Sequence, residues 1–239
     1  MNNYDIDLIK KYIEKSKQEE AIKKYKEGYP VQYLIGNVDF FGNKIIVNEK
    51  VLIPRFETEY LVDDTLKLLK KYNFINPKTL DIGTGSGCIS IALKKNIKCE
   101  VTAVDISRDA LEVAKKNAEI NNVEINFVKQ AIEDFSSFGN FDVIISNPPY
   151  ISMKEKIDPK TKHEPHNALY SNEDGTYFYR VILEKAIDIL AKKSIIAFEI
   201  GDKQGSKVIK MAKELFPKAN IEIKKDLNDF ERYIYIINK

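Results

Sequence analysis

The sequence predicts an α/β protein built on a mostly parallel sheet with one antiparallel strand. Between residues 79 and 215, short apolar segments typical of buried strands alternate with helical patterns, which places parallel strands between helices. A glycine-rich loop follows the first of these strands, where such sheets commonly bind ligands. The last two predicted strands are joined by a loop too short for a parallel crossover, so they run antiparallel.

Composition is that of an ordinary globular protein. The 239 residues suffice for one α/β domain with a small addition, and 44% of them are hydrophobic while 31% are charged. The net charge of +2 provides no strong attraction to phosphates, so we expect no stable nucleic-acid binding. The two cysteines fall in different predicted elements, which excludes a disulfide framework and fits a reducing compartment. Without a signal core or a run of roughly 20 apolar residues, we expect a cytoplasmic monomer with no membrane contact.

Residues 1–30 are predicted to form a reduced helical segment. Ile6, Ile9 and Ile13 recur at helical spacing, and Gly28 and Pro30 end the pattern. The segment is either a packing appendage or a remnant of a domain that docks a partner.

Residues 31–56 are predicted to be a β-hairpin connector, and residues 57–239 the main domain. Two apolar stretches flank Gly42-Asn43, a typical hairpin turn. Thr58 is a candidate cap for the helix that follows. The predicted strands span 79–82, 100–104, 124–128, 141–146, 194–200, 219–224 and 232–237, and the predicted helices between them span 86–95, 108–120, 175–191 and 203–215.

The loop after the first strand reads Asp-Ile-Gly-Thr-Gly-Ser-Gly. Glycines allow a sharp turn and let a ligand lie against the backbone. The spacing differs from that of dinucleotide enzymes. A carboxylate directly before the loop suits an amine-bearing or cationic ligand better than a pyrophosphate, and S-adenosylmethionine has an amine and a sulfonium. The predicted cofactor-binding residues of this loop are Asp81, Gly83, Thr84, Gly85, Ser86 and Gly87.

Asp105 ends the next predicted strand and is followed by Ile106. An acid about 20 residues beyond such a glycine loop is where doubly wound folds hold ribose hydroxyls. We therefore assign both residues to the cofactor site.

The strand at 141–146 ends in Asn147, Pro148, Pro149 and Tyr150. Each proline pushes the preceding residue into an extended conformation, which fixes the Asn147 side-chain carbonyl and the Pro148 backbone carbonyl. Two fixed acceptors can take both hydrogens of one planar NH2 group, and Tyr150 can stack on its face. They also stabilise the positive charge that develops as a weakly nucleophilic amide or amine nitrogen attacks. We predict that Asn147 and Pro148 are catalytic, that all four residues bind the substrate, and that Asn147 also borders the cofactor.

Together, these motifs resemble the class I, Rossmann-like methyltransferases that act on amino or amide nitrogen. Further stretches resemble the HemK/PrmC family of protein-(glutamine-N5) methyltransferases, namely 30–36, 41–42, 53–59 and 164–169. The resemblance implies transfer of a methyl group from S-adenosylmethionine, leaving S-adenosylhomocysteine, to the glutamine of the Gly-Gly-Gln loop in peptide chain release factors. No metal is expected, because the sulfonium is already an activated donor.

The sequence departs from the family at three places. The N-terminal helical bundle is reduced to the residues before Pro30, and Phe56 replaces a proline. An acid that often follows the third strand, near the adenine, is absent, and we expect Ile132 to lie against the adenine face instead.

Two other functions remain open. Enzymes that methylate the exocyclic amine of adenine in DNA or RNA use the same tetrad, but usually carry an added recognition segment. The second alternative is a degenerate methyltransferase fold that only binds a ligand, although the glycine loop and the residues at 147–150 are both intact. His163 and His166 lack a third metal ligand at a suitable spacing. The sequence leaves open whether Glu199 faces the substrate or has a capping role. It also leaves open whether Arg55 pairs with Glu57, Glu59 or the substrate.

Overall fold

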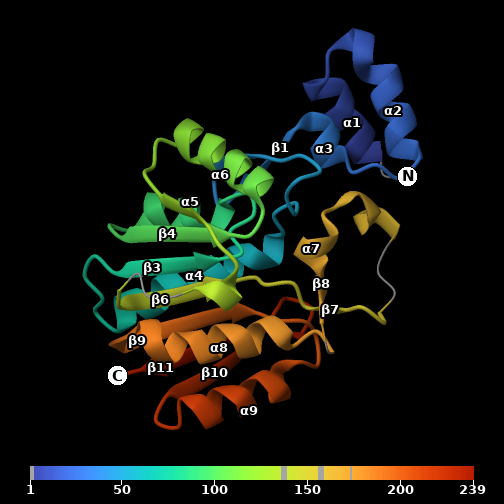
Figure 1. Cartoon of the computed structure of the whole chain (residues 1–239). Helices are drawn as coiled ribbons and strands as arrows, with labels where there is room; N and C mark the ends of the chain where they lie inside the picture. The colour runs from blue at the N-terminus through green and yellow to red at the C-terminus, as the bar shows by residue number, and fades with distance from the viewer. Residues whose placement is uncertain (1–2, 136–138, 156–158, 173) are drawn as a thin grey trace.

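A sheet with helices on both faces forms the centre of the computed structural model, which describes residues 3–135, 139–155, 159–172 and 174–239 (Figure 1). Within these residues, the sheet has seven strands in the order β10-β11-β9-β6-β3-β4-β5. β11 runs antiparallel to both of its neighbours, and the other pairs of strands are parallel. The predicted α/β fold with one antiparallel strand is therefore confirmed.

The strands of the sheet are β3 (Lys78–Ile82), β4 (Glu100–Asp105), β5 (Asn126–Lys129), β6 (Phe141–Ser146), β9 (Leu190–Glu199), β10 (Asn220–Lys225) and β11 (Glu231–Asn238). The helices that cover it are α4 (Phe56–Lys71), α5 (Cys88–Asn96), α6 (Arg108–Ile120), α8 (Tyr177–Ile189) and α9 (Gly205–Leu215). Shorter elements lie between them, namely η2 (Ile132–Asp134), β7 (Ile151–Ser152), η3 (Pro159–His163), α7 (His166–Leu169) and β8 (Tyr170–Ser171).

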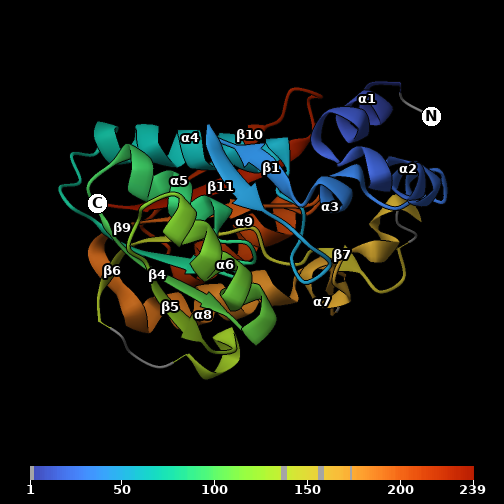
Figure 2. The ribbon, with the colours of Figure 1, turned by 90° about the horizontal axis from the view of Figure 1, so that it is seen from above.

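The two faces of the sheet carry separate apolar cores. α4, α5 and α6 pack on the face that presents Val143, Ile145 and Ala197, and α8 and α9 pack on the face that presents Ile144 and Ile196. Figure 2 shows α4 and α5 on one side of the sheet and α8 on the other. Burial on both faces explains why the strands read as continuous apolar runs in the sequence.

The N-terminal residues form a small helical unit with its own core. α1 (Asn3–Tyr12), η1 (Lys15–Lys17), α2 (Gln18–Lys26) and α3 (Val31–Ile35) surround a cluster centred on Ile9, Ala21 and Val31. The helical spacing predicted α1 and α2, whereas α3 was not predicted. The unit lies beside α7, at one end of the molecule (Figure 1).

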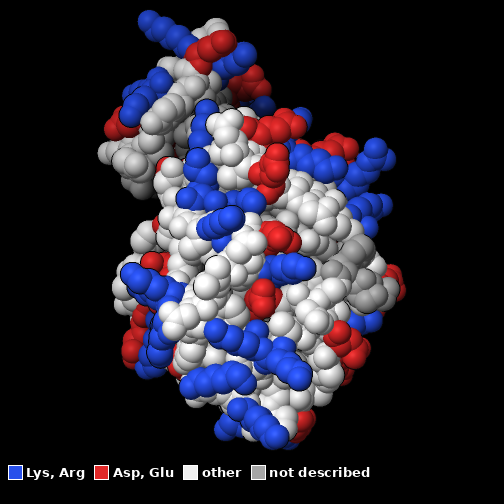
Figure 3. Space-filling view, turned by 90° about the vertical axis from the view of Figure 1, so that its left-hand side faces the viewer, with Lys and Arg blue, Asp and Glu red and all other residues white. Residues whose placement is uncertain are grey.

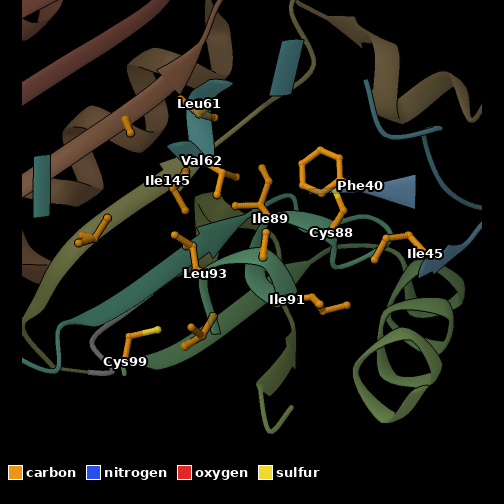
Figure 4. Packing of buried hydrophobic residues seen from close by; sticks show 14 of the residues in the cluster. Phe40, Ile45, Leu61, Val62, Cys88, Ile89, Ile91, Leu93, Cys99 and Ile145 are labelled. Atoms are coloured by element: carbon orange, nitrogen blue, oxygen red, sulfur yellow. The ribbon is translucent and has the colours of Figure 1, made fainter. Parts of the chain in front are cut away.

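The predicted hairpin is present, with its turn one residue earlier than the expected Gly42-Asn43, and it packs on the main core. β1 (Asn37–Phe40) and β2 (Asn43–Ile46) are joined by Phe41 and Gly42, both with positive φ (51° and 72°). Phe40 and Ile45 are buried with Cys88 and Ile89 of the α5 region (Figure 4). By burial, the hairpin is thus continuous with the core of the sheet, which Tyr33 of α3 also joins.

Two local predictions were wrong. Arg55, not Thr58, precedes the first residue of α4, and no side-chain cap is formed; the Thr58 hydroxyl donates to Glu199 instead. α8 ends at Ile189 and β9 begins at Leu190, four residues before the predicted strand, because Leu190 already pairs with Phe141.

Charged side chains of both signs cover the surface seen in Figure 3, the left-hand side of Figure 1, where lysine and arginine are the more prominent. Among the described residues, no helix is long and apolar enough to cross a membrane.

Asn117 joins the hairpin and the glycine loop to α6. Its side chain is fully buried: Oδ1 accepts a hydrogen bond from the Ile46 amide (2.7 Å), and Nδ2 donates to the carbonyls of Ile46 (3.0 Å) and Ser86 (2.9 Å). One amide side chain thereby satisfies backbone groups of two segments that approach from different parts of the chain.

We predict that Asn117→Ala lowers the free energy of unfolding by about 2–4 kcal/mol, because it leaves buried backbone groups without partners. Urea unfolding measures this change. Asn126→Ala is the matched control, because the Asn126 side chain is exposed and makes one long bond of 3.4 Å. Equal losses from the two variants would contradict the assignment.

Candidate functional site

The candidate site lies where three parallel strands end side by side. β3 is followed along the chain by β4 and β5 on one side, whereas β6 and β9 lie on its other side. The order in which the chain adds strands therefore reverses at β3, and such a reversal leaves a crevice at the carboxyl ends of the strands, where open α/β sheets bind ligands. A cavity occupies this position, and residues after β3, β4 and β6 line it.

The structure brings most of the predicted site residues to the wall of this cavity. Those that line it are Gly83, Gly85, Asp105, Ile106, Ile132, Asn147, Pro148 and Pro149. Five predicted residues do not line it, namely Asp81, Thr84, Ser86, Gly87 and Tyr150.

The glycine loop has the left-handed conformations that only glycine adopts easily. Gly83, Gly85 and Gly87 have φ values of 71°, 54° and 81°. A Cβ on Gly83 would meet no atom within 4 Å, so its backbone is open to a ligand. A Cβ on Gly87 would lie 3.1 Å from the Ala114 Cβ, so Gly87 is needed for packing against α6 rather than for the cavity.

Asp81 lies beneath the loop, fully buried. Its Oδ2 accepts hydrogen bonds from the hydroxyls of Thr84 (2.7 Å) and Ser90 (2.6 Å). Its Oδ1 has no hydrogen-bond partner among the described residues. Burial raises the pKa of Asp81 to about 6, against the lowering effect of the two hydroxyls. Asp81 therefore holds the loop and keeps one free acceptor next to it.

Asp105 connects the loop to β4 from the cavity wall. Its Oδ2 accepts from the Gly85 amide (2.9 Å) and its Oδ1 accepts from the Ser107 amide (2.8 Å). Burial raises the pKa of this carboxyl, and the backbone amides oppose the shift. Each oxygen retains lone-pair capacity for a further donor, such as a hydroxyl in the cavity.

Asn147 is held from behind by a residue of α4. Its Nδ2 lies 3.1 Å from the Thr58 Oγ1, and the Thr58 hydroxyl donates to the Glu199 Oε2 at 2.7 Å. Thr58 and Glu199 are 3% and 2% exposed. Burial raises the pKa of Glu199 to about 7, with the Thr58 hydrogen bond and Arg232 opposing the rise.

Tyr150 does not line the cavity. Its backbone carbonyl accepts from Gln204 Nε2 (2.9 Å), and a Cβ on Gly201 would lie 3.1 Å from its Cδ2. A Cβ on Gly175 would lie 2.1 Å from the backbone carbonyl oxygen of Tyr150. The ring therefore packs against Gly201, whereas Gly175 packs against the backbone carbonyl.

The cavity is closed by segments that the prediction of site residues did not include. Lys50, Val51 and Leu52 come from the hairpin side, and Pro165, Asn167 and Ala168 come from the α7 segment. Phe178 and Ile182 of α8 and Gln130, Ala131 and Glu133 near η2 complete the wall. The family resemblance of the stretches at 53–59 and 164–169 was the sequence evidence that these segments belong to the site. Spacing in the sequence alone does not reveal which of their side chains are in contact.

An ion pair between the half-buried Arg55 and the buried Glu164 fixes the α7 segment against the start of α4. Arg55 donates from one terminal nitrogen to both oxygens of Glu164, at 2.7 and 2.6 Å. Arg55 thus pairs with neither Glu57 nor Glu59. The Glu164 side chain is 3% exposed, and burial raises its pKa despite the nearby guanidinium.

Both histidines contact aromatic rings near this segment. The ring of His163 lies 4.9 Å from that of Tyr29, and the ring of His166 stacks on Tyr170 at 4.3 Å. Among the described residues, no group of three or more His, Cys, Asp or Glu side chains is arranged to hold a metal ion.

Comparison with known sequences relates the chain to methyltransferases. Residues 59–165 match the family model described as the methyltransferase small domain. The release factor glutamine methyltransferase of Bacillus cereus is 42% identical over 224 residues, covering 90% of this chain and 79% of that protein. Those of Bacillus subtilis and Flavobacterium psychrophilum are each 40% identical, covering 89% and 91% of this chain and 77% and 79% of their own length.

Solved structures share the fold at lower identity. A methyltransferase from Pyrococcus furiosus is 24% identical with a TM-score of 0.57, covering 82% of this chain and 89% of its own. The catalytic domain of hMettl16, solved with the MAT2A 3′UTR hairpin 1, is 18% identical with a TM-score of 0.63, covering 82% and 75%. These likenesses concern the fold alone.

We predict that Arg55→Ala destabilises the protein by about 2–3 kcal/mol at pH 8, since it leaves the buried Glu164 carboxylate without its partner. The loss should be smaller at pH 5.5, because protonation of Glu164, whose pKa is already raised, removes the unpaired charge. Urea unfolding at both pH values measures the difference. Adding Glu164→Gln to Arg55→Ala should abolish most of the pH dependence, and a dependence that persists would contradict this explanation.

Proposed function

The chain belongs to the family of release factor glutamine methyltransferases, and we propose that it methylates the side-chain amide nitrogen of the glutamine in the Gly-Gly-Gln loop of a peptide chain release factor. The methyl donor in this proposal is S-adenosylmethionine. The observation that carries the proposal is the shared cavity: Asn147 and Pro148, suited to a planar NH2 group, line the same cavity as Gly83 and Asp105, suited to the donor.

The residues around the glycine loop fit S-adenosylmethionine. The unpartnered Oδ1 of Asp81 is an acceptor for an ammonium group, and the open backbone at Gly83 admits a ligand. Asp105 retains acceptor capacity for ribose hydroxyls, and Ile106 and Ile132 offer apolar contacts for a base. When bound, the donor supplies an electrophilic methyl group on a sulfonium.

Asn147 and Pro148 act on the acceptor nitrogen. The Asn147 side-chain carbonyl and the Pro148 backbone carbonyl accept the two amide hydrogens, which holds the nitrogen still and orients it. The lone pair of an amide nitrogen is delocalised, so positive charge builds up on nitrogen during attack, and two fixed carbonyl dipoles stabilise it. The nitrogen releases one hydrogen as a proton to solvent after the new bond forms.

Mass spectrometry of a release factor tests the proposal. After incubation with the protein and S-adenosylmethionine, the Gly-Gly-Gln peptide should gain the mass of one methyl group on glutamine. A release factor whose loop glutamine is replaced by alanine is the control. Methylation of adenine-containing DNA or RNA in place of the release factor would overturn the proposal in favour of the adenine-directed alternative.

Asn147→Ala and Asp105→Ala should separate catalysis from donor binding. We expect Asn147→Ala to lower kcat by about 100-fold or more with donor affinity kept within a few fold, because it removes an oriented acceptor. Asp105→Ala should weaken donor binding first, since it removes both the hydroxyl acceptor and the anchor of Gly85. Calorimetric titration and steady-state kinetics measure these effects, and a near-normal kcat for Asn147→Ala would falsify the orientation mechanism.

Donor affinity should rise with pH and level off above about pH 6. The pKa of Asp81 in the free protein is about 6, and a bound cation favours the ionised carboxylate. Binding therefore releases a proton below that pKa, and the association constant increases as pH rises toward it. Titrations from about pH 5 to 8 measure the slope. Asp81→Asn should bind more weakly and without this slope, and an unchanged slope in that variant would exclude Asp81 as its source.

A further inference from the structure

Three polar side chains from distant parts of the chain form a continuous buried path behind the cavity. Glu199 is the last residue of β9, Thr58 lies in the first turn of α4, and Asn147 follows β6. The Thr58 hydroxyl lies 2.7 Å from the Glu199 Oε2 and 3.1 Å from the Asn147 Nδ2. Only Asn147 of the three lines the cavity.

The chemistry of the three groups gives this path one direction. An ionised carboxylate only accepts hydrogen bonds, so the single hydrogen of the Thr58 hydroxyl is directed at Glu199. The Thr58 oxygen then presents lone pairs to Asn147, and of the two ends of the amide only the NH2 end is a donor. The carbonyl end of the Asn147 amide is thereby turned away from Thr58.

We infer that Thr58 and Glu199 are positioning residues that fix the amide of Asn147 with its carbonyl oxygen available to the substrate NH2. The inference rests on the proposed function, in which that oxygen accepts a hydrogen of the acceptor amide. Without this control the amide can rotate by half a turn and present its own NH2 to the substrate NH2, where two donors repel.

A structural role for Thr58 in helix capping does not explain the contacts. α4 begins without a side-chain cap, and the backbone amide of Thr58 bonds to the Arg55 carbonyl. Its hydroxyl has the partners described above, 141 residues and 89 residues away in the sequence. α4 thus contributes to the site a side chain that serves neither its own end nor its apolar face.

α4 also contains a matched control for the hydroxyl. Thr65 lies two turns further along the helix and is fully buried, and its hydroxyl donates to the Leu61 carbonyl at 2.7 Å. Thr65→Val and Thr58→Val remove the same group from the same helix, but only Thr58→Val breaks the path to Asn147.

Steady-state methylation of the release factor tests the inference. We expect Thr58→Val to lower kcat by about 10- to 100-fold with KM for the release factor and donor affinity within about threefold, and Thr65→Val to leave kcat unchanged. Thr58→Ser, which restores the hydroxyl, should recover most of the activity. Bound donor measured by calorimetry shows that each variant is folded.

The outcomes separate the inference from the function on which it rests. A kcat for Thr58→Val within about twofold of that for Thr65→Val, while the wild type methylates the release factor, overturns the positioning role alone. Absence of release-factor methylation by the wild type overturns the proposed function and the inference together.

Glu199→Gln tests the direction of the path. A glutamine both donates and accepts, so it permits the reverse direction as well, in which the Thr58 hydroxyl donates to the Asn147 oxygen. We expect a lower kcat than that of the wild type at pH 8. Protonated Glu199 has the same freedom, and since its pKa is about 7, the wild-type kcat should fall with decreasing pH toward that of the variant.

In Glu199→Gln, kcat should show no such fall with decreasing pH, because the glutamine amide does not titrate. The other ionisable groups near Glu199 remain in both proteins, and they are Arg55, Glu57, Cys88, Tyr150, Tyr179, Arg232 and Tyr233. If kcat of Glu199→Gln falls at low pH as that of the wild type does, the fall is not due to titration of Glu199. If the two proteins have equal kcat at pH 8, Glu199 does not orient the Thr58 hydroxyl.

Discussion

The candidate site depends on the register of β3 with its two parallel neighbours. Ile82 pairs with Val104 on one side and with Ser146 on the other. The residues that follow these three positions are Gly83, Asp105 and Asn147, so the loop, the acid and the amide leave the sheet at the same level. Because successive side chains in a strand point to opposite faces, a slip of one residue would separate these groups and move the side chains of each apolar core to the other face of the sheet. The two apolar cores therefore enforce the geometry of the site.

Buried polar groups at the same strand ends oppose this stability. Asp81 and Glu199 both have raised pKa values because burial disfavours their ionised forms, and hydroxyls of Thr84, Ser90 and Thr58 compensate only in part. Carboxyls whose folded pKa lies above the unfolded value bind extra protons in the native state, so they reduce stability as pH rises through that interval. Raised pKa values of this kind cluster at functional sites, and the fold accommodates two of them near the carboxyl ends of β3 and β9, on either side of β6.

Features of the site that are local in sequence could be predicted, and features made by distant side chains could not. The glycine loop and the residues at 147–149 are specified by glycine and proline, which act on neighbouring backbone, and all of the latter line the cavity. Thr58 reads as a helix cap from its position alone, because sequence spacing carries no information about Glu199, 141 residues away. The same holds for Arg55 with Glu164, separated by 109 residues. Tyr150 was expected at the substrate because its neighbours are there, but its ring packs against Gly201 and does not line the cavity.

Three long-range contacts have one end in the segment between the N-terminal helices and the sheet. Ile46 bonds to Asn117, Arg55 to Glu164, and Thr58 to the path that ends at Asn147. Lys50, Val51 and Leu52 of the same segment line the cavity. A connector that only linked two units would need none of these bonds. Residues 46–58 are better understood as part of the site, with 50–52 in its wall and Arg55 and Thr58 behind it, which explains why motifs outside the sheet, at 53–59 and 164–169, accompany those within it. The helices before Val31, which pack around a separate cluster, lie outside this arrangement.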